Sequence, residues 1–365
     1  MNKQPSLKVI VMAGGTGGHV FPALSVAEKL KQRGATISWL GTARGIEAEL
    51  VPAAGIKLHC LTIEGVRGRG LGAKLKAPWL LVKAVLQARR ILRQEQADIV
   101  LGLGGFASGP GGVAAWLMRK PLLIHEQNAV AGTTNRWLSK IANRVMAAFP
   151  NSLEDAIHVG NPVRDSIGVV EPVDENKTGS LNVLVLGGSL GALALNELLP
   201  KALASIDEQE RPQVMHQTGK RHLAVTKALY HDQKVNAEVV EFIADMAAAY
   251  QWADVIVCRA GALTVSELTL AGRTALLVPF PFAIDDHQTK NAQWLADNNA
   301  GVLIQQKDLT VEKIVSFITD LSRDRKRLVQ MSNNAKALAM PNAANDVADY
   351  CEQAASGKLK EAANG

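Results

Sequence analysis

The chain has little of what marks disulfide-stabilised or zinc-binding proteins. It contains 3 cysteines, Cys60, Cys258 and Cys351, which lie far apart and form no CxxC pair. This spacing excludes a disulfide framework and a cysteine zinc site, and it predicts a reducing compartment. The chain also has no D-x-D motif, so we expect no metal held by paired aspartates and no other cofactor.

Long hydrophobic runs are absent as well. The longest apolar stretch, residues 78–86, contains Lys83 and is far shorter than the ~20 residues that a membrane-spanning helix needs. The first residues lead from a short polar segment into a strand-like run, without the apolar region of a signal peptide. We therefore expect no signal peptide and no segment that crosses a bilayer.

Aromatic residues are scarce, at 4% of the chain, whereas 47% of the residues are apolar and 31 are glycine. This composition favours a parallel α/β architecture. An apolar run, a glycine-rich turn and a helix-compatible segment follow one another four times, at residues 9–19, 99–112, 183–192 and 255–267. Because the strands of a parallel sheet are buried on both faces, these unbroken runs predict two doubly wound domains.

The two domains are predicted to join at residues 159–164, where glycine and proline interrupt the pattern and the charge balance changes. We expect an N-terminal domain at 1–163 and a C-terminal domain at 164–340. Apolar residues at helical spacing predict a further helix within 341–357, which could pack back on the first domain.

Positive charge is concentrated in the first half of the chain. Up to Gly160 there are 20 Lys and Arg against 9 Asp and Glu, and beyond it 20 against 25, so the net charge of +6 divides into about +11 and about −5. Such asymmetry is typical of a domain that faces a polyanion, such as nucleic acid, anionic lipid or a phosphorylated ligand. From charge alone, a merely basic soluble surface is the simpler interpretation.

Three glycine-rich turns follow predicted strands. The turn at 14–19 opens a helix, which is a phosphate-binding geometry, but it is not a P-loop, and Val20 stands where a dinucleotide fingerprint needs glycine. The turn at 104–112 has more glycines than packing alone explains, which indicates the close approach of a ligand. The turn at 187–192 offers the Ser189 hydroxyl and a helix N-terminus to a phosphate.

Polar residues also stand at predicted strand ends, where open α/β sheets bind their ligands. His-Glu-Gln-Asn at 125–128 follows an apolar run, although an ordinary exit from a strand is the alternative for any one of these residues. Glu267 could bind a sugar diol, or it could be a capping-box carboxylate paired with Thr264. Asp-Asp-His-Gln at 285–288 offers further sugar-binding groups.

Taken together, these segments resemble glycosyltransferase family 28 over nearly the whole chain. The motifs that carry the resemblance are, in chain order, AGGTGGHVFPAL, GGFASGPGG, HEQNAVAGTTN, VGNPVR, GGSLGA, CRAGALTVSE and DDHQTKNA. The resemblance implies a GT-B fold, in which two Rossmann-like domains face each other across a cleft. It also implies inverting, metal-independent transfer of N-acetylglucosamine (GlcNAc) from UDP-GlcNAc to the C4 hydroxyl of N-acetylmuramic acid (MurNAc) in undecaprenyl-pyrophosphoryl-MurNAc-pentapeptide (lipid I), which gives lipid II for peptidoglycan.

The same resemblance implies a set of binding residues. The second domain would bind the donor, with the uracil at Ile243, the ribose at Glu267, the pyrophosphate at Arg164 and Ser189, and the GlcNAc hydroxyls at Gln288 beside His287. The remaining implied contacts are Ala262, Leu263, Thr264, Val265 and Ser266 along the nucleotide, Thr16, Gly17, Gly18 and Asn128 over the donor, and Gly104 and Gly105 at the acceptor pyrophosphate. This chain has Leu190 where the family commonly has glutamine, so a polar contact near the donor is missing or replaced.

Direct displacement needs a base for the acceptor hydroxyl. His19 is the candidate, because a histidine pKa of ~6.5 suits proton abstraction near neutral pH. The alternative is that His19 only orients the acceptor or its pyrophosphate, and Glu126 is the rival base.

The region 65–93 suggests attachment to a membrane surface. Leu75, Trp79, Val82 and Leu86 fall at helical spacing among basic residues, a pattern typical of an interfacial helix, although a buried core stripe would look the same. A lipid-linked acceptor favours the membrane. We therefore expect a peripheral protein on the cytoplasmic face of the inner membrane, with anionic lipid as a partner, other cell-wall enzymes as candidate partners, and no nucleic acid.

Three other classes of protein stay open on the residues alone. A nicotinamide oxidoreductase fits the fold, but the broken fingerprint and the missing ribose acid argue against it. A sugar-nucleotide epimerase would need no lipid acceptor. A basic polyanion-binding module would explain the charge but not the polar residues at the strand ends.

Overall fold

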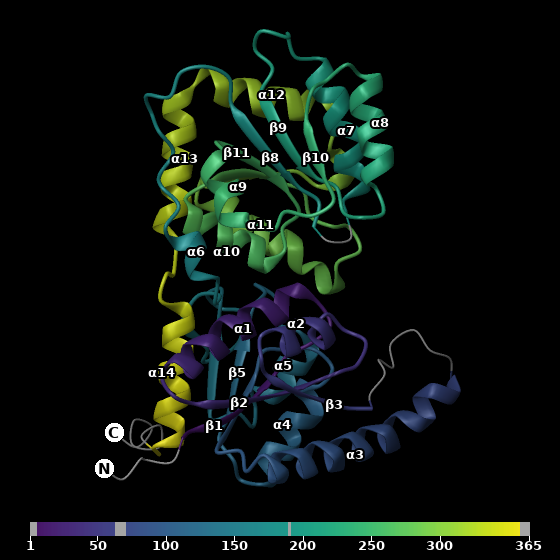
Figure 1. Cartoon of the computed structure of the whole chain (residues 1–365), viewed down its shortest axis with the longest axis vertical. Coiled ribbons are helices and arrows are strands. Elements are labelled where there is room, and N and C mark those ends of the chain that lie inside the picture. Colours follow the sequence, from purple (N-terminus) through teal and green to yellow (C-terminus); the bar gives the residue numbers. More distant parts are fainter. Residues whose placement is uncertain (1–5, 63–70, 189–190, 358–365) are drawn as a thin grey trace. The chain divides into compact units, whose positions relative to one another are not determined.

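The computed structural model describes residues 6–62, 71–188 and 191–357. The chain forms two compact units, each built on its own parallel sheet (Figure 1). Unit 1 comprises Met1–Arg164 and Met340–Gly365, and unit 2 comprises Asp165–Ala339. Arg164 and Met340 therefore both belong to unit 1.

Unit 1 contains a seven-stranded parallel sheet in the order β3-β2-β1-β4-β5-β6-β7. Its strands are β1 (Lys8–Met12), β2 (Thr36–Gly41), β3 (Lys57–Cys60), β4 (Ile99–Gly102), β5 (Leu122–Glu126), β6 (Arg144–Ala147) and β7 (Ile157–His158). Alternate residues of the central strand β1 enter two different cores, because successive strand side chains point to opposite faces. Val9 and Val11 pack into one core, and Ile10 and Met12 into the other.

Helices cover both faces of this sheet. They are α1 (Gly17–Gln32), α2 (Glu47–Ala53), α3 (Leu71–Gln94), α4 (Ser108–Leu117), α5 (Thr133–Leu138) and α14 (Ala343–Ala355). The last helix, α14, packs against α1 and buries Val347 and Cys351 in the core that holds Val9. Arg33, at the end of α1, pairs with Asp349 and Glu352 of α14.

Unit 2 contains a six-stranded parallel sheet in the order β10-β9-β8-β11-β12-β13. Its strands are β8 (Asn182–Leu186), β9 (Gln213–Gln217), β10 (Glu238–Val240), β11 (Val255–Cys258), β12 (Thr274–Leu277) and β13 (Gly301–Leu303). The helices are α6 (Asp165–Gly168), α7 (Leu193–Ala204), α8 (Leu223–Asp232), α9 (Met246–Trp252), α10 (Ala262–Ala271), α11 (His287–Asp297), α12 (Val311–Arg323) and α13 (Arg325–Ala337), with short 3₁₀ turns η1 (Ile284–Asp286) and η2 (Gln306–Asp308).

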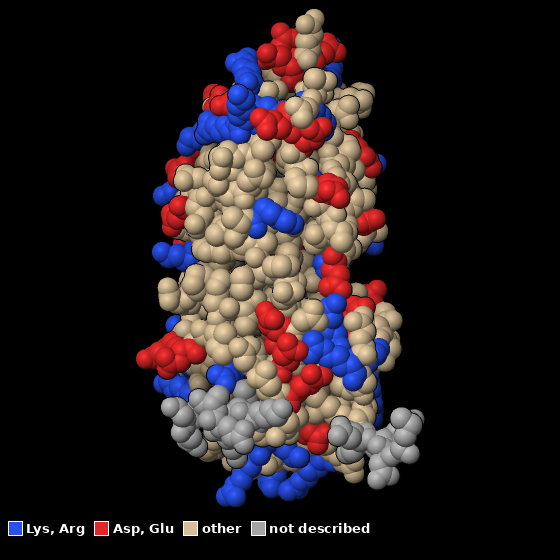
Figure 2. All heavy atoms as spheres, turned by 90° about the vertical axis from the view of Figure 1, so that its left-hand side faces the viewer, with Lys and Arg blue, Asp and Glu red and all other residues tan. Residues whose placement is uncertain are grey.

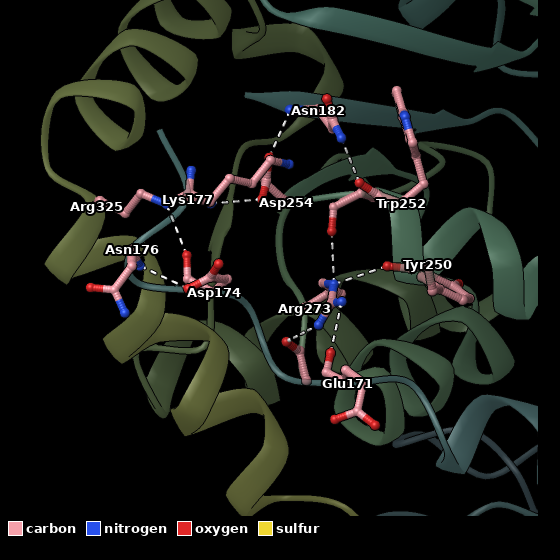
Figure 3. A network of polar contacts seen from close by, with 12 residues as sticks. Glu171, Asp174, Asn176, Lys177, Asn182, Tyr250, Trp252, Asp254, Arg273 and Arg325 are labelled. Carbon is pink, nitrogen blue, oxygen red and sulfur yellow. Dashed lines mark hydrogen bonds and ion pairs between the residues drawn. The ribbon is translucent and has the colours of Figure 1, made fainter. Parts of the chain in front are cut away.

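A polar network holds the amino edge of the unit 2 sheet (Figure 3). Arg273 is buried, and its guanidinium donates to five backbone carbonyls, including those of Ala253 and Glu171. Asp254 pairs with Lys177 at 2.7 Å and with Arg325 at 2.9 Å. This network anchors the segment that enters unit 2 and leaves the carboxyl ends of the strands available for a site.

Candidate functional site

The turn after β1 is built around a buried carboxylate that the sequence did not reveal. Glu47 is fully buried, and it accepts hydrogen bonds from the backbone N–H of Gly15 at 2.9 Å and from the Thr42 hydroxyl at 2.7 Å. A Cβ atom at Gly14 would overlap this carboxylate, and Gly15 has φ +92°. Glu47 therefore takes up the Gly15 N–H within the turn, so an anion at this turn would be bound by the N–H groups at the start of the helix.

The N-terminus of α1 still has the character of an anion site. Thr16 is the N-cap, and its side chain makes no capping hydrogen bond. The first turn contains no acidic residue, and Gly17 and Gly18 carry no side chain that could cover the backbone. The N–H groups of a first helical turn have no partner within the helix, so they and the helix dipole attract negative charge.

Packing explains most of the glycines in the second turn. Gly104 and Gly105 have φ +103° and +85°, values that favour glycine. A Cβ atom at Gly105 would lie 2.5 Å from the Gly14 carbonyl oxygen, and one at Gly104 would lie 2.9 Å from the His19 ring. A Cβ atom at Gly111 would overlap a methionine sulfur of β1. Packing thus accounts for these three glycines, whereas a Cβ atom at Gly109 would meet only one ordinary contact at 3.6 Å. The expectation that packing does not explain every glycine of this turn stays a prediction.

His19 is the half-buried outer end of a chain of polar groups. Its Nδ1 lies 2.8 Å from Gln127 Oε1, Gln127 Nε2 lies 3.1 Å from His125 Nδ1, and His125 Nε2 lies 2.8 Å from the Gly160 oxygen. Gln127 and His125 are buried, and burial lowers the pKa of His125 to about 4. His125 is therefore a neutral core histidine near pH 7, whereas His19 is accessible to solvent.

Glu126 is committed to its own loop. Its carboxylate is buried and accepts from the Asn128 N–H at 2.9 Å, the Gly132 N–H at 3.1 Å and the Asn135 side-chain amide at 2.8 Å. A carboxylate that accepts several N–H bonds orients the loop that supplies those bonds. The same contacts fix the backbone of Asn128 at the end of β5.

Arg164 lies in unit 1 beside α1. Its guanidinium carbon is 5.5 Å from the centroid of the Phe21 ring. Both residues line a hollow of about 630 Å³ together with Glu28 and Lys31. The structure thus places this cation against the side of α1.

The turn after β8 in unit 2 resembles the turn after β1, because glycines with positive φ lead into a helix that has no side-chain cap. Gly188 and Gly191 have φ +75° and +79°, and a Cβ atom at Gly191 would overlap the Thr218 carbonyl oxygen. Ala192 precedes α7, which has no side-chain cap and no acidic residue in its first turn. The predicted phosphate ligand Ser189, and Leu190, lie outside the described residues.

Helix α10 presents the predicted nucleotide segment, Ala262 to Glu267. Gly261 is its N-cap, so Glu267 is its sixth residue. The capping-box interpretation of Glu267 with Thr264 is therefore wrong. Glu267 is 5% exposed and accepts a hydrogen bond from the Tyr250 hydroxyl at 3.1 Å. Of the six residues, Leu263 and Thr264 are half-buried, and the rest are buried.

Gln288 is held at the start of α11. Its Oε1 accepts from the Phe280 N–H at 2.9 Å, which leaves its NH₂ group as a donor. Arg259 fixes the same turn by donating to the Val278 carbonyl at 3.1 Å and stacking 5.6 Å from the Phe280 ring. Ile243, the predicted uracil contact, is buried in the loop after β10.

The two units match two parts of one protein family. The model of the glycosyltransferase family 28 N-terminal domain matches residues 9–147, and that of the family 28 C-terminal domain matches residues 182–347. The chain belongs to glycosyltransferase family 28. With the two parallel sheets, these matches confirm the GT-B fold class predicted for this glycosyltransferase.

Relatives of the glycosyltransferase agree with this assignment. It is 57% identical to a UDP-N-acetylglucosamine--N-acetylmuramyl-(pentapeptide) pyrophosphoryl-undecaprenol N-acetylglucosamine transferase of Cellvibrio japonicus, over 96% of this chain and 99% of the relative. The crystal structure of Acinetobacter baumannii MurG is similar, with TM-score 0.84 and 43% identity over 95% of this chain and 99% of that one. A UDP-GlcNAc 2-epimerase from Neisseria meningitidis shares the fold, with TM-score 0.66 and 13% identity over 94% of this chain and 99% of that one.

Helix α3 of the glycosyltransferase exposes apolar side chains to solvent. Trp79, Val82 and Leu86 are 73%, 51% and 58% exposed, whereas Ala88 and Leu92 on the same helix are buried in the core. The interpretation of the predicted stripe as core is therefore wrong for these three residues, and the side chain of Leu75 lies outside the described part. No helix among the described residues is long and apolar enough to span a membrane.

Basic side chains are exposed on this helix, at Lys83 and Arg90. Elsewhere in unit 1, Lys140 lies 5.0 Å from the ring centroid of exposed Trp137. In Figure 2, Lys and Arg gather at the lower end of unit 1, whereas acidic and basic side chains mix over the rest of that face and over unit 2. Part of the positive charge that the sequence assigns to the first half is thus gathered at one end of unit 1.

Proposed function

We propose that this glycosyltransferase moves GlcNAc from UDP-GlcNAc to the C4 hydroxyl of MurNAc in lipid I, with inversion at the anomeric carbon, and so forms lipid II. The observation that carries the proposal is the 57% identity to the Cellvibrio japonicus transferase over nearly the whole of both chains, because the name of that relative states both substrates. An epimerase is less well supported, since 13% identity to one epimerase is a likeness of fold alone.

In the proposed reaction, His19 is the base. The C4 oxygen of MurNAc attacks C1 of GlcNAc, its proton passes to a ring nitrogen of His19, and the bond from C1 to the UDP oxygen breaks. His19 is half-buried and lies in the first turn of α1, whose N-cap makes no side-chain hydrogen bond. Glu126 is the weaker candidate, because its buried carboxylate already accepts four N–H bonds that hold its loop.

The departing UDP carries negative charge that positive groups must stabilise. For this role we assign the N-terminus of α7 after Ser189, which has no acidic residue in its first turn, and Arg164. Gln288 would donate its free NH₂ group to a GlcNAc hydroxyl, and Glu267 would accept from the ribose. The bond between Glu267 and Tyr250 supports that role by orienting the carboxylate.

The proposed membrane contact is made by unit 1. Exposed Trp79, Val82 and Leu86 would enter the interface, and Lys83 and Arg90 would attract anionic headgroups, each by ~1 kcal/mol near the surface. This would bring the enzyme to its lipid-linked acceptor on the cytoplasmic face. Co-sedimentation with vesicles should fall when anionic lipid is removed, when salt is raised, or in Trp79→Ser. If co-sedimentation is unaffected by all three changes, the proposed membrane contact is wrong.

The reaction is tested by transfer of radiolabelled GlcNAc from UDP-GlcNAc to a short-chain lipid I analogue, with free UDP quantified and the acceptor omitted as the control. Transfer that depends on the acceptor, with one UDP released per sugar, is the expected result. Release of UDP without transfer would contradict the proposal and point to a hydrolase or an epimerase.

A further inference from the structure

The chain of hydrogen bonds behind His19 has a fixed direction. It starts at the Gly160 carbonyl, which can only accept, so the group that faces it over 2.8 Å is an N–H at His125 Nε2. Burial lowers the pKa of His125 to about 4, so this ring is neutral near pH 7 and its Nδ1 carries a lone pair. His125 can therefore only accept at Nδ1.

Gln127 transmits this direction toward His19. Its Nε2 group donates to His125 Nδ1 and to the His125 carbonyl oxygen, both at 3.1 Å, and this uses both of its hydrogens. The amide is thereby oriented with Oε1 toward His19 Nδ1 at 2.8 Å. Because an amide oxygen only accepts, His19 Nδ1 must carry the hydrogen.

The consequence appears at the opposite nitrogen of the His19 ring. A neutral imidazole that carries its hydrogen on Nδ1 has its lone pair on Nε2, where it can accept a proton. Gly104 also lies against this ring, and a Cβ atom there would be 2.9 Å from His19 Cε1 and Nδ1. The ring is thus held from two loops, and Gln127 selects its tautomer.

We propose that Gln127, oriented by His125 and the Gly160 carbonyl, is a positioning residue that keeps Nε2 of His19 unprotonated and ready to receive the proton of the acceptor hydroxyl. The inference rests on the proposed function, in which His19 is the base. Without an acceptor at Nδ1, the ring would populate both tautomers, and the one with its hydrogen on Nε2 cannot act as a base there.

The tautomer itself can be measured in the unaltered protein. The chain has 8 histidines, and ¹⁵N-histidine labelling with long-range ¹H–¹⁵N correlation distinguishes protonated from unprotonated ring nitrogens. The His19 signal is assigned by its loss in His19→Asn. In the neutral His19 ring, we expect Nδ1 to be protonated and Nε2 unprotonated. A His19 ring with its hydrogen on Nε2 would overturn the proposal whatever any variant does.

Two substitutions at Gln127 separate positioning from a merely structural role. Gln127→Met removes the acceptor at similar length, so we expect both tautomers of His19 and a kcat lower by roughly 10- to 100-fold, a smaller loss than removal of a general base gives. Gln127→Glu keeps the acceptor and adds charge, so His19 should keep its Nδ1 hydrogen, and the acidic limb of the kcat/KM profile should move to higher pH. Other titratable groups on the elements around His19 are Glu47 at the start of α2, and His125 and Glu126 at the end of β5.

The matched control is His231→Asn, which removes an exposed histidine of unit 2 and should leave kcat unchanged. Equal losses in Gln127→Met and Gln127→Glu, with the tautomer and the pH profile unmoved, would overturn the proposal. Failure of the proposed function is distinguishable, because it would show as absent GlcNAc transfer in the unaltered enzyme while the nitrogen signals of His19 could still be read.

Discussion

Each unit buries a histidine in a chain of polar groups, and the two chains end differently. In unit 1, His125 connects through Gln127 to half-buried His19. In unit 2, His216 donates from Nε2 to Asn196 Oδ1 at 3.0 Å and accepts at Nδ1 from the Tyr230 hydroxyl at 2.9 Å, and all three residues are buried. The first chain is open toward solvent, and the second is closed inside the core.

This difference separates a functional arrangement from a structural one made of the same residue type. In both chains a side-chain amide is fixed by its donor bond, at Gln127 by His125 and at Asn196 by the Thr218 carbonyl. A closed chain satisfies buried polar groups and adds stability. An open chain also satisfies the buried polar groups at its inner end. In addition, it determines which nitrogen of the accessible histidine at its outer end carries the hydrogen.

The largest contrast is expected in catalysis. His19→Gln removes the proposed base and should lower kcat for GlcNAc transfer by about 10²- to 10⁴-fold. Tyr230→Phe alters the closed chain in unit 2 and should leave kcat within about twofold, since it touches no proposed substrate contact. Initial rates at saturating donor and acceptor measure both values. If His19→Gln has a kcat close to that of the unaltered enzyme, His19 at the open end of the unit 1 chain is not the base.

Acid should weaken both chains. Burial lowers the pKa of His125 to about 4 and that of His216 to about 3, below the ordinary value of 6.5. Their neutral forms therefore contribute stability that is fully present above pH 6.5. This stability is lost as the pH falls from 6.5 to about 4 for His125 and from 6.5 to about 3 for His216. At 1.36 kcal/mol per pH unit, His125 alone would cost unit 1 about 3 kcal/mol at pH 4.

Hydrogen exchange with mass spectrometry measures this loss of stability separately for the two units, on peptides from each. The measurement runs between pH 7 and pH 4.5 and is corrected for intrinsic exchange rates. His216→Leu should flatten the acid dependence in unit 2 and leave unit 1 unaffected. Equal flattening in both units would show that the two chains do not act on their own units.

The smallest contrast concerns one hydroxyl. Tyr230→Phe leaves His216 Nδ1 buried without its donor, which should lower the free energy of unfolding of unit 2 by about 1–3 kcal/mol. Tyr350→Phe is the matched control in unit 1, because this half-buried tyrosine contacts Arg144 through its ring, and its loss of hydroxyl should cost under about 0.5 kcal/mol. Urea unfolding monitored by hydrogen exchange measures both. An unchanged free energy of unfolding in Tyr230→Phe would show that the hydrogen bonds of the closed chain do not stabilise unit 2.

The sequence was sufficient for the features that depend on local pattern. Unbroken apolar runs followed by glycine predicted the parallel sheets, and the spacing of Val347 and Cys351 predicted the helix that the structure shows at Ala343–Ala355. His19 and residues 125–128 stand at strand ends, where ligands bind in such sheets. These inferences need only residues close together in the chain.

The features that the sequence did not reveal depend on partners far apart in the chain. Glu47 reaches Gly15, 32 residues away, and Gln127 reaches His19 across 108 residues. No spacing rule connects such pairs, although the glycines around Glu47 at Gly41 and Gly45 were a usable signal. The capping-box interpretation failed for a related reason, because Gly261 supplies the N-cap of α10 by backbone conformation rather than by a recognisable side chain.

The return of α14 to unit 1 has a consequence for biosynthesis. All of unit 2, Asp165–Ala339, is translated before the residues that complete unit 1. Until Val347 and Cys351 emerge from the ribosome, the nascent first unit exposes the apolar surface of α1 and β4 that α14 later covers. Unit 2 can therefore finish folding first, while unit 1 waits for the last helix of the chain and for the pairing of Arg33 with Asp349 that fastens it.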